Sequence, residues 1–110
     1  MNILCLTGRV ADSPVRRDTN KGVVCEFRLA AHGRPRVWIT VVTWGHLAGV
    51  CAQHLSTGRA VAVTGALHHD QYTTRAGERA ERWYCKATDV TFLGPPESAG
   101  EEREREQVAS

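Results

Sequence analysis

A change of hydrophobic period near the middle of the chain constrains its fold most. Residues Val37 to Trp44 are almost all β-branched or aromatic, and they form the strongest strand signal in the sequence. From His46 to Leu55 the apolar residues instead recur at helical spacing. Because the rest of the chain shows only the two-residue alternation typical of strands, we expect an all-β protein with one short helix.

Four further strands are predicted on the same alternation. They span Asn2 to Val10, Val23 to Ala31, Arg59 to Leu67 and Glu81 to Leu93. The stretch Ala11 to Gly22 is rich in turn-forming residues and is expected to be a loop. His68 to Arg79 is expected to be a long hairpin that turns near Ala76-Gly77. Five strands with a helix between the third and fourth is the order of the OB-fold, a five-stranded β-barrel, here with a long hairpin between strands 4 and 5.

Composition divides the 110 residues into a basic body and an acidic tail. Residues 1–94 hold twelve basic and seven acidic side chains, whereas residues 95–110 hold two Arg and five Glu. We expect one domain over residues 1–94 and a disordered charged tail over 95–110. A basic body suits a polyanion partner, and twelve of the fourteen basic residues are arginine, which also stacks on bases. An arginine-rich codon bias explains that usage equally well.

The four cysteines show no metal or disulfide pattern. Cys5, Cys25, Cys51 and Cys85 are scattered without Cys-x-x-Cys spacing, so we expect four small buried thiols. No apolar run has membrane-spanning length, and Arg9 interrupts the apolar N-terminus, which therefore lacks the pattern of a signal peptide. These features predict a cytoplasmic protein that does not engage the membrane.

Catalytic and metal-binding constellations are not evident. His68 and His69 are adjacent on an expected strand, so their side chains point to opposite faces and do not easily share one ion. The carboxylates Glu78, Glu81 and Asp89 show no paired geometry for acid–base work, and the chain contains no glycine-rich phosphate loop. We expect a protein that is not an enzyme and that uses no metal or cofactor.

The strand Val37 to Trp44 predicts where a ligand would bind. One face carries Arg36, Trp38, Thr40, Val42 and Trp44. The other face carries Val37, Ile39 and Val41, which are expected to fill the barrel. The two tryptophans are six residues apart, roughly 20 Å at about 3.3 Å per residue, so separate bases could stack on each ring. The competing interpretation is that they are core or interface residues, the usual place for tryptophan on a strand.

Several segments occur in an order and spacing typical of one known family. They are Asn2 with Gly8-Arg9-Val10, Arg17 to Gly22 (Arg-x-Thr-x-x-Gly), Phe27 to Ala30, Trp38 to Ala48 (Trp…Val-x-x-[Phe/Trp]-Gly-x-Leu-Ala), Gly58, Val61, Val63 to Gly65, Leu67, Tyr72, Gly77 and Val90 to Leu93. Over about residues 2 to 94 the chain thus resembles the bacterial single-stranded DNA-binding protein family. Members are OB domains that usually form homotetramers, and the resemblance implies self-association here, with Asn2 matching the position where subunits pair.

The resemblance implies weakly sequence-selective binding of single-stranded DNA in replication, recombination or repair, and association with the nucleoid. Trp38, Trp44 and Tyr72 would stack on bases, with Thr40 on the same face as the tryptophans. Arginines at strand ends and loops would bind phosphate: Arg9, Arg34, Arg36, Arg75 and Arg79, with Arg17 and Arg28 as weaker candidates. Trp83 matches no stacking position of the family, so we expect it to pack.

Departures from the family pattern leave a second interpretation open. The loop His32 to Arg36 is short and lacks an aromatic residue, and positions that are often basic in the family hold His46, His68 and Asp70. The tail ends Glu106 to Ser110 without the family's Ile-Pro-Phe acidic tip. We therefore expect a short paralogue or a phage- or plasmid-type member that does not dock replication enzymes through such a tip. The alternative is an OB-fold protein-interaction adaptor of the primosomal type, with weak DNA binding.

Overall fold

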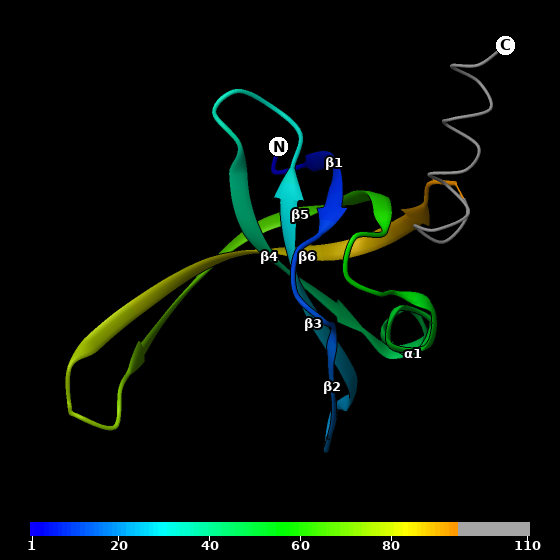
Figure 1. The fold of residues 1–110 in the computed structure, drawn as a ribbon. Coiled ribbons are helices and arrows are strands. Elements are labelled where there is room, and N and C mark those ends of the chain that lie inside the picture. The colour runs from blue at the N-terminus through cyan, green and yellow to red at the C-terminus, as the bar shows by residue number, and fades with distance from the viewer. Residues whose placement is uncertain (95–110) are drawn as a thin grey trace, which may run out of the picture.

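The computed structural model describes residues 1–94, and in this range the chain forms six strands and one helix (Figure 1). The elements are β1 (Leu4–Val10), β2 (Val15–Thr19), β3 (Gly22–Ala31), β4 (Val37–Trp44), α1 (Gly45–His54), β5 (Ala60–Thr73) and β6 (Arg79–Phe92). The expected charged tail lies outside the described residues. No helix in residues 1–94 is both long and apolar enough to cross a membrane.

The strands close into a barrel. Their order in the sheet is β1-β5-β6-β4-β3-β2, and β1 also pairs with β3, which joins five of the strands into a ring. The pairing of β4 with β6 is parallel, and all the others are antiparallel. The helix follows β4 directly, so the predicted OB-fold with one short helix is confirmed.

The additional strand β2 corrects one prediction, because Ala11 to Gly22 is not only a loop. Val15–Thr19 pairs with β3 through a tight turn at Asn20-Lys21, where the Thr19 hydroxyl donates to the carbonyl of Gly22 at 2.7 Å. Pro14 precedes the strand, so its missing N–H removes no ladder bond. All five residues of β2 are exposed, and hydrophobic alternation therefore gave no signal for this strand.

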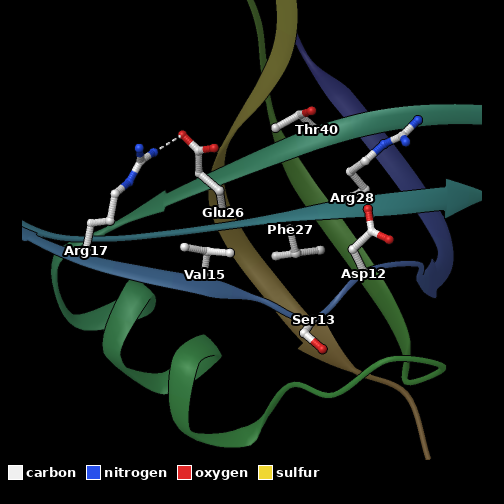
Figure 2. A pocket seen from close by; sticks show the side chains of 8 residues that line it. All are labelled: Asp12, Ser13, Val15, Arg17, Glu26, Phe27, Arg28 and Thr40. Carbon is white, nitrogen blue, oxygen red and sulfur yellow. Dashed lines mark hydrogen bonds and ion pairs between the residues drawn. The ribbon is translucent and has the colours of Figure 1, made fainter.

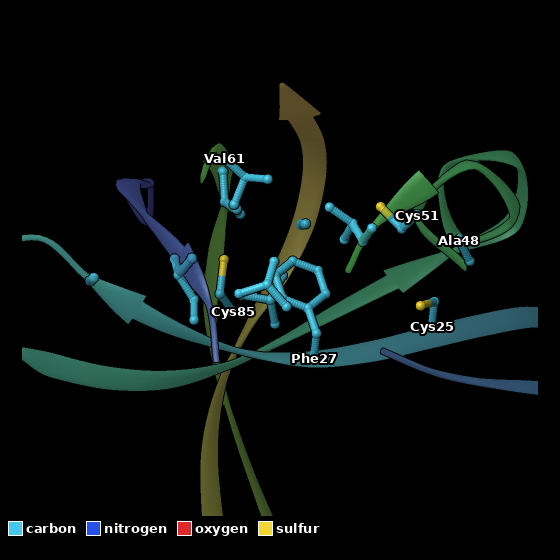
Figure 3. Close-up of a cluster of buried hydrophobic side chains, with 13 residues drawn as sticks. Cys25, Phe27, Ala48, Cys51, Val61 and Cys85 are labelled. Atoms are coloured by element: carbon cyan, nitrogen blue, oxygen red, sulfur yellow. The ribbon is translucent and has the colours of Figure 1, made fainter. Parts of the chain in front are cut away.

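The barrel interior follows the two-residue alternation of β3 and β4. Cys25, Phe27 and Leu29 alternate along β3 and are buried on one face, and Ala48 and Cys51 of α1 belong to the same cluster of buried side chains (Figure 3). Val41 of β4 is fully buried as expected, and Ile39 is partly buried. Val37 was expected inside but is exposed, because it begins β4, where the strand emerges from the short 32–36 loop.

Two glycines permit the close approach of strands that closes the barrel. A Cβ atom at Gly8 would overlap the backbone carbonyl oxygen of Ala30, and one at Gly65 would overlap that of Lys86. Gly65 also lies at a register shift between β5 and β6. A side chain at either position would force neighbouring backbones apart.

The hairpin arm, residues 68–84, continues β5 and β6 beyond the barrel (Figure 1). The pairing of β5 with β1 ends at Gly65, and the pairing of β6 with β4 involves only residues 84–86, so the outer part of the arm is a two-stranded ribbon. The strands end at Thr73 and restart at Arg79, which confirms the predicted turn near Ala76-Gly77. In the turn, the Gly77 N–H donates to the carbonyl of Thr74 at 2.9 Å.

Candidate nucleic-acid interface

The outward face of β4 exposes two aromatic rings. Trp38 is 52% exposed and Trp44 is 39% exposed, at opposite ends of the strand. Thr40 is partly buried between them, and Val42 is only 3% exposed although it belongs to the same face. The alternation therefore places both indole rings at the surface, with a covered position between them.

Strand β6 extends this face onto the hairpin arm. Because directly paired residues share a face of a sheet, the parallel pair of Thr40 with Tyr84 places the Tyr84 side chain beside β4. Arg82 lies two residues earlier on the same face of β6, and Tyr72 of β5 pairs with Ala80 on that face too. Tyr72 is 50% exposed. We call the continuous surface from Trp44 across β4 and β6 to Tyr72 the aromatic face.

Arginines lie against two rings of the aromatic face. The guanidinium carbon of Arg28, on β3, lies 5.6 Å from the centroid of the Trp38 ring. That of Arg82 lies 4.8 Å from the Tyr84 ring, which also stacks with His68 at 5.5 Å. These are cation–π distances. Burial raises the pKa of the Tyr84 hydroxyl, and the neighbouring Asp70 carboxylate raises it further.

A hollow of about 230 Å³ opens beside this face (Figure 2). Its lining comes from β2, β3, β4 and the segment that joins β1 to β2: Asp12, Ser13, Val15, Arg17, Glu26, Phe27, Arg28 and Thr40. At one end, Arg17 Nη2 donates to Glu26 Oε1 at 2.7 Å. The hollow thus combines basic, acidic and apolar walls within reach of the outward face of β4.

The structure brings together six of the eleven predicted site residues. Trp38, Trp44, Tyr72, Thr40, Arg28 and Arg17 lie on or beside the aromatic face. The exposed Arg34 and Arg36 precede β4 in the 32–36 loop, and Arg75 lies in the turn of the hairpin arm. Arg9 lies on β1, where its Nη1 donates to the carbonyl of Gly58 at 2.9 Å. Arg79 pairs with Thr73 and lies on the hairpin face opposite Tyr72.

Trp83 corrects the expectation that it packs. It is 56% exposed and lies on the arm's other face, where its ring centroid is 4.2 Å from that of His69. His69 Nε2 lies 2.9 Å from Glu81 Oε2. Cys85, two residues later on the same face of β6, is buried in the barrel. Trp83 therefore lies on the face that packs into the core further along β6, but at a point where the arm extends beyond the barrel. His68 and His69 contact different rings on opposite faces, as strand geometry predicted.

Three residues of the aromatic face were missed in the sequence. Arg82 and Tyr84 alternate on one face of β6, and this spacing could have identified them. Glu26 of β3 pairs with Val42 of β4, and its carboxylate accepts hydrogen bonds from both Arg17 and Arg82. Arg17 is 9 positions from Glu26 in the sequence, and Arg82 is 56 positions from it. Alternation within a strand does not reveal contacts between such distant residues.

The thiols belong to the barrel and lie apart from this surface. Cys25, Cys51 and Cys85 are buried, whereas Cys5 is exposed, contrary to the expectation of four buried thiols. Burial raises the pKa of Cys51 to about 11. Burial also raises the pKa values of Cys25 and Cys85. Among residues 1–94, no three His, Cys, Asp or Glu side chains are grouped to hold a metal ion.

Comparison with known proteins places this geometry in a family. Residues 1–93 match the model of the single-strand binding protein family. The chain is 37% identical over 109 residues to a single-stranded DNA-binding protein of Caldanaerobacter subterraneus, with 91% of this chain and 73% of that protein covered. It is 30% identical over 112 residues to single-stranded DNA-binding protein 1 of Chlorobaculum tepidum, with 91% and 69% covered.

A solved structure has the same architecture. The crystal structure of the small single-stranded DNA-binding protein from Streptomyces coelicolor superposes with a TM-score of 0.71 at 27% sequence identity. The superposition covers 83% of this chain and 93% of that one. The family match over nearly all the described residues and this shared barrel agree, and the chain belongs to the single-strand binding protein family.

Proposed function

We propose that this protein binds single-stranded DNA with little sequence preference and protects it during replication, recombination or repair. Family membership supports this function, and the similar proteins from Caldanaerobacter and Streptomyces carry single-stranded DNA binding in their names. Trp38 and Trp44 stack on bases, and arginines around them bind the phosphates. The protein acts by binding and not by catalysis.

The observation that carries the proposal is the exposure of three aromatic rings on one continuous face. Trp38 and Trp44 lie at the two ends of β4, and Tyr72 lies on the arm that extends the same face. Base–aromatic stacking contributes about 1–3 kcal/mol per base and accepts any base, because every base has a π-face. A face built in this way favours affinity without sequence selection.

Tryptophan fluorescence during titration with poly(dT) tests the proposal. We expect strong quenching at low salt, with binding weakened by Trp38→Ala and by Trp44→Ala. Trp83→Ala is the matched control, because this exposed indole lies on the other face of the arm and its loss should leave the affinity unchanged. Absence of quenching at low salt would refute the proposal. Capture of a replication protein together with an affinity for DNA only in the millimolar range would select the adaptor function instead.

We also propose that the domain assembles as a homo-oligomer, a homotetramer in particular. The pairing of β1 with β3 begins only at Gly8, so the outer edge of β1 from Leu4 to Leu6 pairs with no strand among residues 1–94. Two hydrogen bonds between the Asn2 side chain and the backbone of Leu67 hold the segment before this edge. Such an edge suits strand addition by a second copy. A monomer mass of 12.1 kDa in light scattering at micromolar concentration would contradict assembly.

Incubation of labelled single-stranded DNA with the protein and Mg²⁺ tests the absence of catalysis. The DNA should remain intact, and degradation that a single carboxylate substitution abolishes would show an enzyme instead. In cells, a tagged protein should colocalise with the nucleoid, as expected of a protein that coats exposed single strands.

A further inference from the structure

A carboxylate, Glu26 of β3, lies beside the aromatic face between an arginine of β2 and an arginine of β6. Glu26 Oε1 accepts from Arg17 Nη2 at 2.7 Å and from Arg82 Nη2 at 3.3 Å. The Glu26 side chain is only 20% exposed, less than either of the two arginines that hold it. One carboxylate oxygen therefore serves two guanidinium groups, and we call these three residues the Glu26 triad.

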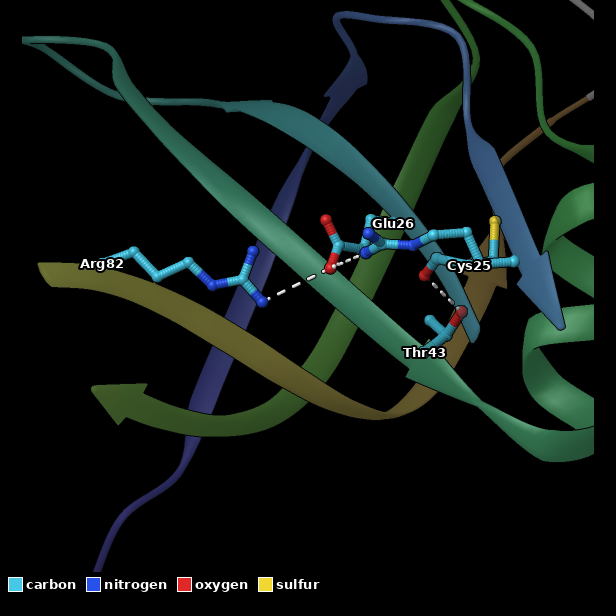
Figure 4. Close-up of polar contacts among 5 residues, drawn as sticks. Cys25, Glu26, Thr43 and Arg82 are labelled. Carbon is cyan, nitrogen blue, oxygen red and sulfur yellow. Dashed lines mark hydrogen bonds and ion pairs between the residues drawn. The ribbon is translucent and has the colours of Figure 1, made fainter. Parts of the chain in front are cut away.

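The Glu26 triad spans the width of the sheet. The strand order β6-β4-β3-β2 places Arg82 two strands from Glu26 on one side and Arg17 one strand away on the other. Figure 4 shows the Arg82 side chain extending from β6 toward β4, in front of which its guanidinium meets the Glu26 carboxylate. Val42, the β4 partner of Glu26, faces outward but is buried. The contact between Arg82 and Glu26 over β4 accounts for this burial.

This position is where the backbone of a bound strand must pass. Trp38 and Trp44 lie on either side of Val42 along β4, so DNA that stacks on both rings runs along β4 and passes the Glu26 triad. Each intervening nucleotide brings a negative phosphate. A carboxylate that already binds both guanidinium groups competes with phosphate for the same donors and repels the phosphate charge.

We infer that Glu26 is an internal competitor of DNA phosphate, which lowers both the affinity of the aromatic face and its dependence on salt. This inference rests on the proposed function. Two arginines and one glutamate together offer the strand one net positive charge instead of two. The carboxylate thereby keeps binding weak enough for the strand to be released, while the arginines remain in place over the sheet.

Substitution Glu26→Gln tests the inference, because it keeps the shape of the side chain and removes the charge. Affinity for a poly(dT) oligonucleotide at low salt should rise about three- to tenfold, and the plot of log affinity against log salt should steepen by about 0.7, the slope for one more neutralised phosphate. Thermal unfolding by circular dichroism verifies that the variant is folded. Unchanged or weaker binding by the folded variant would overturn the inference.

Glu81→Gln is the matched control. It makes the same change of charge but lies on the face of the arm opposite Tyr72, beside His69. Its affinity for the oligonucleotide should stay within about twofold of the original, since this carboxylate contacts His69 on the far face and is solvated by water, whose high dielectric constant weakens its effect on a distant phosphate. An equal rise in Glu81→Gln and Glu26→Gln would show that net charge alone is responsible, and the inference would be wrong.

A double-mutant cycle locates the effect at the arginines. Arg82→Gln should weaken binding more in the Glu26→Gln background than in the original protein, because only there is the Arg82 charge fully available to phosphate. Equal losses in both backgrounds would refute the competition. If the original protein itself fails to bind poly(dT), the proposed function fails; if it binds but the cycle shows no coupling, only the role of Glu26 fails.

Discussion

Raising the pH through the range 9 to 11 should weaken the fold through its buried thiols. Cys51 of α1 lies in the core cluster, and burial raises the pKa of its thiol from 9.0 to about 11. Within this range the folded state keeps the Cys51 proton, whereas the unfolded state loses it. Because the folded state then binds more protons, the free energy of unfolding falls as pH rises.

The size of the effect follows from that pKa difference. One pKa unit corresponds to about 1.4 kcal/mol, so Cys51 alone should remove about 3 kcal/mol of stability once the pH exceeds about 11. Below pH 9 its contribution is constant. Domains of this kind have about 5–15 kcal/mol of stability in total, so the loss should be clearly measurable. The raised pKa values of Cys25 and Cys85 act in the same direction.

Urea unfolding at a series of pH values, at one fixed protein concentration, measures the effect. Cys51→Ala should flatten the fall in stability by about 3 kcal/mol relative to the original protein, because the variant has no thiol to deprotonate at this position. Cys5→Ala is the control, since Cys5 is exposed and its removal should leave the alkaline slope unchanged. An alkaline slope identical in the original protein and in Cys51→Ala would refute the assignment to this thiol.

Three further results are expected. Gly65→Ala should destabilise the domain by about 1–3 kcal/mol in urea unfolding, because the added Cβ overlaps a neighbouring carbonyl oxygen, whereas Gly49→Ala has open space and should stabilise α1 by about 0.5–1 kcal/mol. A thiol reagent should modify Cys25, Cys51 and Cys85 only after unfolding, and modification at the rate of a free thiol in the folded protein would contradict their burial. Tyr72→Ala should weaken binding of a long oligonucleotide by about 1–3 kcal/mol in fluorescence titration, and unchanged affinity would place the bound strand off the hairpin arm.

The predictable parts of this fold are those in which one face of an element is buried. β3 and β4 alternate between core and surface, so their faces could be assigned from the sequence, as the burial of Phe27 and the exposure of Trp38 show. β2 was missed because no residue in it is buried. Trp83 was misassigned because the rule that one face packs inward holds only inside the barrel, and the sequence does not mark where the arm leaves it.

The candidate site was predictable along β4 but not across the sheet. Trp38, Thr40 and Trp44 follow from alternation within β4, whereas the meeting of Arg17, Glu26 and Arg82 depends on strand register. A shift of one residue in β3 would turn Glu26 toward the core. Charge counting treats these three residues as independent surface charges, and only the register shows that the carboxylate offsets part of the charge of the two arginines.

Register also explains how an arginine-rich chain uses its charges differently on the two faces of the hairpin arm. On the Tyr72 face, Arg82 contacts both an aromatic ring and a carboxylate, and its planar guanidinium allows it to do both at once. On the other face, the partner of Trp83 is His69, which Glu81 holds in turn. Because a guanidinium has five donors and two flat faces, Arg82 can give up one contact to a phosphate or a base without leaving its place, which a lysine ammonium, with no flat face, does not offer. At this face, Arg82 therefore has a physical role beyond its contribution to net charge.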